Sequence, residues 1–189
     1  KQNFDWERAP FGRDLELAAQ QKTAKGGLWK VLARTEAGGM QLWQPQPGES
    51  SRGMLIHLKN TYSYAQTNWR KGYENGWSLF GGISYSQNKD ILNLGGLDLE
   101  RKSQLTHAKW TAGYDFSDRL SVKNGVEYFR NEYSEVLTIE NMERTFGENQ
   151  GYLFTEWDWY LSRKLVLRSG LRVGISTLAN EKWLDPRTS

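Results

Sequence analysis

Hydrophobic and polar residues alternate along most of this chain with a period of two. The alternation is clearest over residues 151–176, where two segments flank a short turn at 161–163. In the first segment Leu153 and Trp157 fall on one face, while Glu156 falls on the other. This period is typical of a β-strand whose two faces meet different environments. The segment is therefore predicted to be a hairpin with arms of about ten residues or more, a length that suits tilted membrane-spanning strands of ~9–11 residues.

The same alternation recurs in earlier parts of the chain, from residue 27 onwards. A second hairpin is expected around the tight turn at 117–119. Two long polar segments, 87–103 and 131–149, separate the tight turns, and we expect both to be loops. Short turns at one end of the strands and long loops at the other are typical of membrane β-barrels.

These observations predict an all-β fold, namely an antiparallel up-and-down transmembrane β-barrel. The barrel portion is expected to cover residues 25–189 with about eight strands, the smallest number found in such barrels. Residues 1–24 lack a clean period, and we expect an irregular segment or loop there. No apolar stretch approaches the roughly 18 residues that a transmembrane helix needs, so a helical membrane protein is excluded.

The alternation also sorts side chains into two faces, and the apolar face is expected to contact lipid. Aromatic residues lie near the ends of these segments, as in the aromatic girdles at the two bilayer interfaces. The residues expected to face lipid are Trp77, Leu79, Ile83, Trp110, Trp157, Trp159, Leu165, Leu167, Leu171 and Val173. The polar residues expected to face the barrel lumen are His57, Lys59, His107, Lys109, Lys123, Glu127, Glu156, Asp158, Arg168 and Arg172.

Composition narrows the functions that such a fold could serve. The chain has 189 residues, no cysteine, nine tryptophans, nine tyrosines and nineteen glycines. The absence of cysteine excludes disulfides and cysteine-ligated metal sites, and the aromatic and glycine content is typical of strands and turns. The net charge is +3, but lysine and arginine are interleaved with acidic residues rather than gathered in blocks. Nucleic-acid binding is therefore not expected.

The polar face offers charged residues but no recognisable catalytic or metal-binding motif. His57 and His107 are not accompanied by serine and carboxylate residues at the spacing of a catalytic triad. The glutamates that could hold a cation lack the regular spacing of a calcium loop, and they are Glu132, Glu135, Glu140, Glu143 and Glu148. We therefore expect cross-strand ion pairs along the lumen, no metal, no cofactor and no enzymatic activity.

The hairpin over residues 152–172 resembles a recurring pattern in the barrel domain of TonB-dependent transporters of the Gram-negative outer membrane. It has an aromatic-rich strand, a polar turn at 161–163, an alternating strand and then Gly-Leu-Arg at 170–172. Residues 114–122 repeat this style of turn. Residues 183–187 resemble the Pro-Arg segment that opens a further strand in that family.

The likeness is strongest over residues 104–189, weaker over 54–86 and absent before about residue 25. It implies a segment of a 22-stranded barrel that surrounds a plug domain in the bacterial outer membrane. The implied function is import of a scarce nutrient, which would be a siderophore, cobalamin, a glycan or a peptide. The implied partners are the lipid bilayer, a plug domain, a TonB-type energy coupler, and a surface lipoprotein or small-molecule ligand. Some of the lumenal charges would then contact the plug or the substrate.

Two alternatives remain open beside this interpretation. Neither a plug nor a TonB-contacting segment can be recognised in the sequence, and no terminal aromatic strand precedes Ser189, so further strands are expected in a larger barrel. The first alternative is a complete eight-stranded outer-membrane barrel with a structural, adhesive or lipid-modifying role. The second is a soluble β-barrel binding protein with the aromatic residues in its core, because alternation alone does not identify the outer face.

Overall fold

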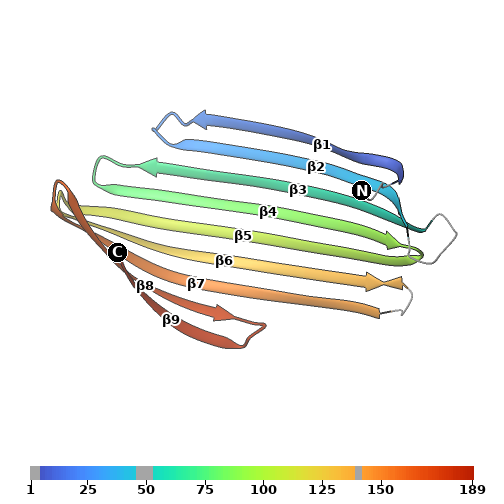
Figure 1. The fold of residues 1–189 in the computed structure, drawn as a ribbon. Coiled ribbons are helices and arrows are strands. Elements are labelled where there is room, and N and C mark those ends of the chain that lie inside the picture. The colour runs from blue at the N-terminus through green and yellow to red at the C-terminus, as the bar shows by residue number, and fades with distance from the viewer. Residues whose placement is uncertain (1–4, 46–52, 139–141) are drawn as a thin grey trace.

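The computed structural model describes residues 5–45, 53–138 and 142–189, and nearly all of them lie in strands. The described strands are β1 (Asp5–Lys22), β2 (Leu28–Gln44), β3 (Met54–Gly72), β4 (Trp77–Leu94), β5 (Leu97–Ser117), β6 (Leu120–Leu137), β7 (Met142–Ser162), β8 (Leu165–Ser176) and β9 (Glu181–Thr188). Each strand pairs with the next one in the chain, so the nine strands form one antiparallel sheet in sequence order (Figure 1). The predicted all-β, up-and-down fold is confirmed, and the sheet contains one strand more than the expected eight or so.

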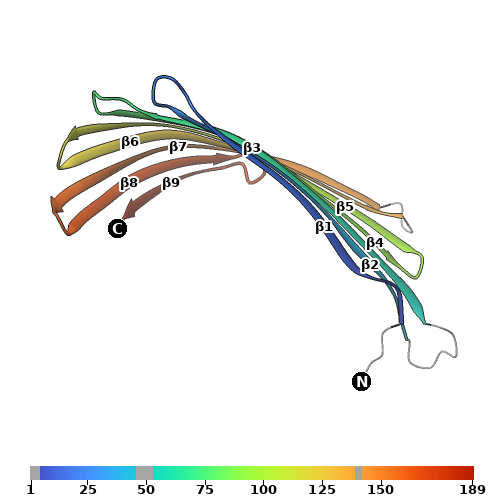
Figure 2. The same ribbon diagram turned by 90° about the horizontal axis from the view of Figure 1, so that it is seen from above.

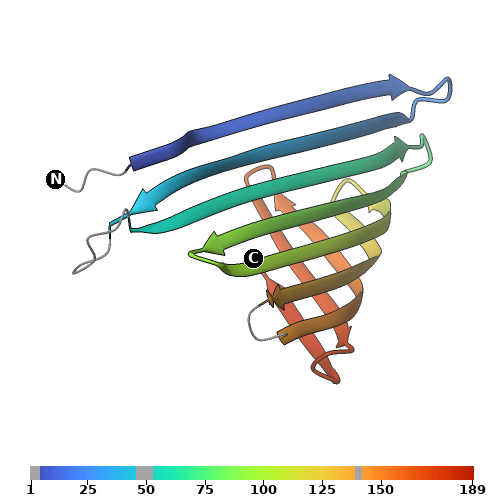
Figure 3. The same cartoon turned by 90° about the vertical axis from the view of Figure 1, so that its right-hand side faces the viewer.

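The sheet is a single curved layer whose first and last strands do not meet. Figures 2 and 3 show β1 and β9 at opposite edges of an open, bent surface. A sheet in one layer has no second layer against which to bury its faces. Accordingly, Leu42, with 6% exposed, is the only buried hydrophobic side chain among the described residues, whereas Ile83 and Leu153 are exposed. The apolar side chains of this sheet are therefore not buried by the described chain itself, and contacts with its surroundings must stabilise both faces.

Most strands are much longer than the sequence pattern predicts. β5 and β7 contain 21 residues each. The loop expected at 87–103 is wrong, because β4 and β5 continue through it and only Gly95 and Gly96 join them. Both glycines have positive φ angles, 57° and 99°, as a tight two-residue hairpin turn requires. β6 and β7 likewise occupy most of the loop expected at 131–149, of which residues 139–141 lie outside the described residues.

The N-terminal segment is also a strand. Residues 1–24 were expected to be irregular, but β1 covers Asp5–Lys22, while residues 1–4 lie outside the described part of the chain. The pairing of β1 with β2 shifts register between Trp6 and Arg8 and again between Arg8 and Phe11. Such irregularities break the period of two before Phe11, whereas from Phe11 to Lys22 the pairing with β2 is regular. In the residues that the structure describes, no helix is long and apolar enough to cross a membrane.

Candidate functional site

Strand register sorts the side chains into two faces. Residues that are paired across antiparallel strands point to the same side of the sheet. Lys109 on β5 pairs with Glu127 on β6, whereas the next residue, Trp110, pairs with Val126. We call the side that carries Lys109 the charged face and the side that carries Trp110 the aromatic face.

The register brings most of the predicted face residues together. The ten residues expected to face lipid share the aromatic face, with Leu165 placed there by alternation within β8. Eight of the ten residues expected in a lumen share the charged face: His107, Lys109, Lys123, Glu127, Glu156, Asp158, Arg168 and Arg172. The contact of one face with lipid and of the other with a lumen stays a prediction.

His57 and Lys59 are exceptions, and grouping them with the other polar residues was wrong. They pair with Asn93 and Ile91 of β4, which lie on the same side of that strand as Ile83. Both residues therefore belong to the aromatic face. The reason is that the polarity of this face changes partway along the strands.

Each long strand has two halves with opposite polarity patterns. On β4, the aromatic face is apolar from Trp77 to Tyr85, next to the tight turn that precedes the strand. Beyond Tyr85 the same face carries Gln87 and Lys89. We call the half next to the turns at 73–76, 118–119 and 163–164 the belt half, and the half that ends at the Gly95–Gly96 turn the distal half. His57 and Lys59 lie in the distal half of β3.

In the distal half, the charged face is aliphatic. Two rows of paired residues cross the sheet there. The first runs from β2 to β5 and consists of Leu42, Ile56, Leu94 and Leu97. The second runs from β2 to β6 and consists of Met40, Leu58, Leu92, Leu99 and Leu137. The next row toward the belt half is polar. In it, the Asn60 amide donates a hydrogen bond to Asp90 at 2.6 Å. Arg101 and Glu135 form an ion pair in the same row, also at 2.6 Å.

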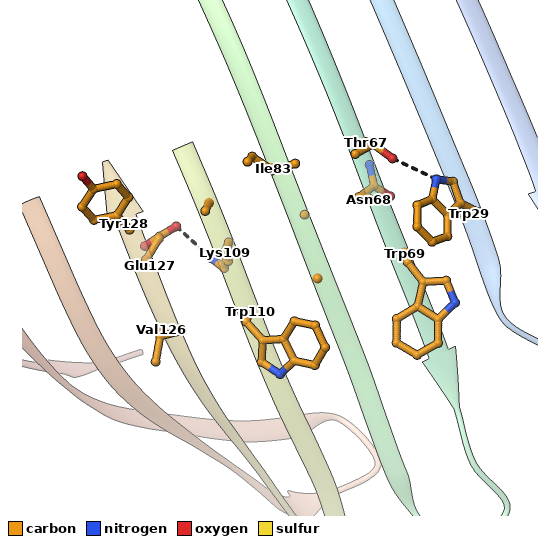
Figure 4. A pocket seen from close by; sticks show the side chains of 13 residues that line it. Trp29, Thr67, Asn68, Trp69, Ile83, Lys109, Trp110, Val126, Glu127 and Tyr128 are labelled. Atoms are coloured by element: carbon orange, nitrogen blue, oxygen red, sulfur yellow. Dashed lines mark hydrogen bonds and ion pairs between the residues drawn. The ribbon is translucent and has the colours of Figure 1, made fainter. Parts of the chain in front are cut away.

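The predicted polar residues of the belt half converge on Glu127, whose side chain is only 10% exposed. Its carboxylate accepts a hydrogen bond from Arg172 Nη2 at 2.9 Å and lies 3.2 Å from Lys109 Nζ. Figure 4 shows the Lys109–Glu127 pair. His107 Nε2 lies 3.2 Å from the same carboxylate, and its ring stacks on Phe129 with centroids 4.1 Å apart. Three strands contribute to this contact: Phe129 and Glu127 lie on β6, His107 and Lys109 on β5, and Arg172 on β8, across the width of β7.

Two further ion pairs continue the charged face toward the tight turns. Arg168 donates two hydrogen bonds to Asp158, from Nε at 2.6 Å and from Nη2 at 3.0 Å. This fork geometry is the strongest arrangement of a guanidinium and a carboxylate. Lys123 Nζ lies 3.6 Å from Glu156. The expected cross-strand ion pairs are therefore present along this face.

Sequence reasoning missed the aromatic side chains that pack among these charges. The Arg172 guanidinium lies 3.8 Å from the centroid of the Tyr152 ring, and Lys109 Nζ lies 5.1 Å from that of Phe154. Cations are attracted to the faces of such rings. Alternation does place Tyr152 and Phe154 on the same face as Glu156, which was the available signal. The strand pairing that brings them to particular cations could not be read from the sequence.

Glycines on the charged face provide room for these rings. A Cβ atom added at Gly125 would overlap the ring of Phe154, and one added at Gly174 would overlap the ring of Trp183. Both glycines are covered by an aromatic side chain of the neighbouring strand, a pairing that stabilises strands with exposed glycine backbone. At these two positions the neighbouring ring occupies the space that a side chain would take.

The aromatic face has a shallow hollow in its belt half (Figure 4). The hollow has a volume of about 470 Å³ and lies between Trp29 and Trp69 on one side and Trp110 on the other. The Trp29 indole donates a hydrogen bond to the Thr67 hydroxyl at 2.8 Å, which satisfies its polar group. Such a surface can contact hydrocarbon without leaving this donor unpaired.

The described acidic residues of 131–149 are divided between the two faces rather than gathered at one point. In the described part of the chain, no group of three or more His, Cys, Asp or Glu residues could hold a metal ion. Within 131–149, Glu135 and Glu148 lie on the charged face, whereas Glu132 lies on the aromatic face. Glu140 lies outside the described residues. The candidate site is therefore the ion-pair cluster around Glu127.

Comparison with known proteins gives a fold but no family. No family model matches the chain, and no curated protein matches it. Among solved structures, it is similar to the RagAB peptide importer in its open-open state, with a TM-score of 0.68 and 8% identity over 94% of this chain and 29% of that one. For the outer-membrane transporter YddB from Escherichia coli, the TM-score is 0.55 and the identity 10%, over 94% of this chain and 35% of that one. For the copper transporter OprC, the TM-score is 0.52 and the identity 15%, over 96% of this chain and 37% of that one.

These likenesses identify the sheet as having the fold of an outer-membrane β-barrel wall. At 8–15% identity they show the fold alone. The chain spans about a third of the length of these proteins.

Proposed function

We propose that this chain is a sector of the wall of a larger β-barrel in the bacterial outer membrane. The observation that carries the proposal is the open, single-layered sheet with an apolar aromatic belt on one face and ion pairs on the other. A strand edge that faced lipid would leave its backbone groups without hydrogen bonds, and closed barrels avoid this cost. Additional strands beyond β1 and β9 would satisfy both edges.

The charged face lines the lumen of this barrel. Glu127 on β6 contacts Arg172 on β8 although β7 lies between them. Side chains of non-adjacent strands approach one another on the concave side of a curved sheet, and they diverge on the convex side. On the aromatic face, Trp110 is 50% exposed and Leu153 61%, as expected for the convex side. Charges on the concave side then meet water or protein, and the belt meets lipid.

The barrel serves as a TonB-dependent importer of a scarce nutrient. Support comes from the resemblance of the hairpins to that family and from the likeness to solved structures of importers and transporters. The ion pairs and their aromatic neighbours suit a wide lumen packed against a plug domain, since barrels of 22 strands have a plugged lumen. A TonB-type coupler would supply the energy. A surface lipoprotein or a small-molecule ligand would bind at the distal half.

Uptake measurements test this function. A strain that lacks the gene for the full-length protein is compared with its parent for uptake of labelled siderophores, cobalamin, oligosaccharides and peptides. Loss of one uptake in the deletion strain, and its inhibition by a protonophore in the parent, are the expected results. Uptake that is lost but insensitive to the protonophore would identify a passive pore instead. Unchanged uptake of every compound would contradict an importer.

A further inference from the structure

Two cations in the belt half of the charged face share one carboxylate. In the described part of the chain, the ion pairs of Lys109 and Arg172 both end on Glu127, at 3.2 and 2.9 Å. The neighbouring basic residues each have a carboxylate of their own, in the pairs Lys123–Glu156, Arg168–Asp158 and Arg187–Asp185. Lys109 and Arg172 together therefore carry one more positive charge than Glu127 can balance.

Arg172 also has a hydrogen-bond donor without an acceptor. Its Nε atom is buried and has no partner among the described residues, although Nη2 donates to Glu127. The guanidinium packs against the Tyr152 ring, a contact that does not replace a hydrogen bond in the guanidinium plane. A buried donor on a charged group costs free energy when it is left unpaired. Arg172 thus brings charge to this face, while its buried Nε atom has no acceptor within the described sheet.

A cavity lies beside these two cations on the charged face. Its volume is about 590 Å³. Its lining includes Lys109, Arg168, Arg172 and Arg187. Because Arg168 and Arg187 are paired with Asp158 and Asp185, the positive charge that lacks a partner lies at Lys109 and Arg172. Clefts lined by one sign of charge concentrate ligands of the opposite sign. The cavity also has a side wall of Phe154, whose ring holds Lys109 in place.

We propose that Lys109 and Arg172 form a binding site for one oxyanion group, a carboxylate or a phosphate. The planar guanidinium and the ammonium would both donate hydrogen bonds to it, and it would balance the positive charge that Glu127 leaves over. The group comes either from an acidic side chain of a domain inside the barrel or from an anionic ligand in the lumen. The site rests on the proposed function, because it requires the charged face to line a lumen.

Chemical modification of the full-length protein in phospholipid vesicles tests the site and distinguishes the two sources. A carbodiimide joins a lysine amine to a carboxylate with which it is ion-paired, and the linked peptides are identified by mass spectrometry. A link from Lys109 to an acidic residue outside residues 1–189 identifies a domain inside the barrel as the source. If the source is a free ligand, citrate or inorganic phosphate slows acetylation of Lys109 by about tenfold instead.

Lys123 is the matched control, because it lies on the same face and already pairs with Glu156. The rate of Lys123 acetylation should change less than about twofold when citrate or phosphate is added, because this lysine gains no new charged hydrogen bond. Arg172→Gln should abolish the link or the protection at Lys109, whereas Arg172→Lys and Arg168→Gln should retain it. A Lys109 that is linked only to Glu127 and is not protected by citrate or phosphate would overturn the proposal. The readout is a modification of one residue, so it stands or falls separately from the uptake measurements.

Discussion

The belt half and the distal half of the same strands carry opposite polarity on the same face. On the aromatic face of β4, Ile83 lies in the belt half, and Lys89 lies six residues further along. The pairing of β4 with β5 continues through both halves without a register shift. The backbone is therefore the same in both halves, and only the surroundings differ. The period of two in an alternation indicates a strand. Which face carries the apolar residues indicates the medium on each side of that strand.

Cysteine labelling should separate the two halves most sharply. His57→Cys in the distal half and Leu79→Cys in the belt half lie on the same face, and this chain has no cysteine of its own. In isolated outer membranes with the full-length protein in a cysteine-free background, a water-soluble maleimide should label His57→Cys. Leu79→Cys should stay unlabelled until detergent replaces the lipid. Equal labelling of both positions in intact membranes would contradict the division into halves.

An introduced charge should produce the next largest difference. Ile83→Arg places a cation near the middle of the belt, where we expect a loss of about 2–4 kcal/mol in the free energy of unfolding from the membrane. Ile91→Arg, on the same face of the same strand in the distal half, should cost about 0–1 kcal/mol. Denaturant titration of the full-length protein in vesicles measures both. Similar losses of unfolding free energy for the two variants would contradict the difference in environment between the two halves.

Removal of a shared carboxylate should cost less than a charge in lipid. Glu127→Gln leaves Lys109 and Arg172 without their common partner, and we expect a loss of about 1–3 kcal/mol. Glu132→Gln is the distal control, because its partner Arg130 is 58% exposed and such pairs contribute about 0–1 kcal/mol. The same titration compares the two variants. A larger loss for Glu132→Gln would show that Glu127 does not organise the belt half.

The smallest effect is expected from single indole hydrogen bonds. Trp29→Phe removes the donor to Thr67 in the belt half, where water cannot replace it, and should cost about 0.6 kcal/mol. Trp43 in the distal half donates to Glu7 at 2.9 Å. Because water can take over that bond, Trp43→Phe should cost less. Equal losses in vesicles would indicate that the belt half is as wet as the distal half.

The belt half could be predicted from the sequence, and the distal half could not. The alternation around the turn at 117–119 placed Lys109 and Glu127 on one face and Trp110 on the other, as the register does, because all three residues lie in the belt half. The same rule failed for His57, because the apolar residues of the distal half lie on the charged face. β1 escaped notice because its register shifts break the period before Phe11 and because only Leu15 and Leu17 are large and apolar beyond it. The convergence of Arg172 and Glu127 depends on curvature across three strands, which no local pattern encodes.

The length of β5 determines how far the wall stands above the bilayer. Its 21 residues, at a rise of ~3.3 Å and a tilt of ~40°, give a height of roughly 50 Å. The hydrocarbon core accounts for about 30 Å of this height. About 20 Å of hydrogen-bonded sheet therefore rises above the hydrocarbon, and the turn at Gly95 and Gly96 ends it without a flexible loop. A large molecule that approaches the membrane here contacts the rigid end of the sheet first. This end shields the lipid headgroups beside it from contact.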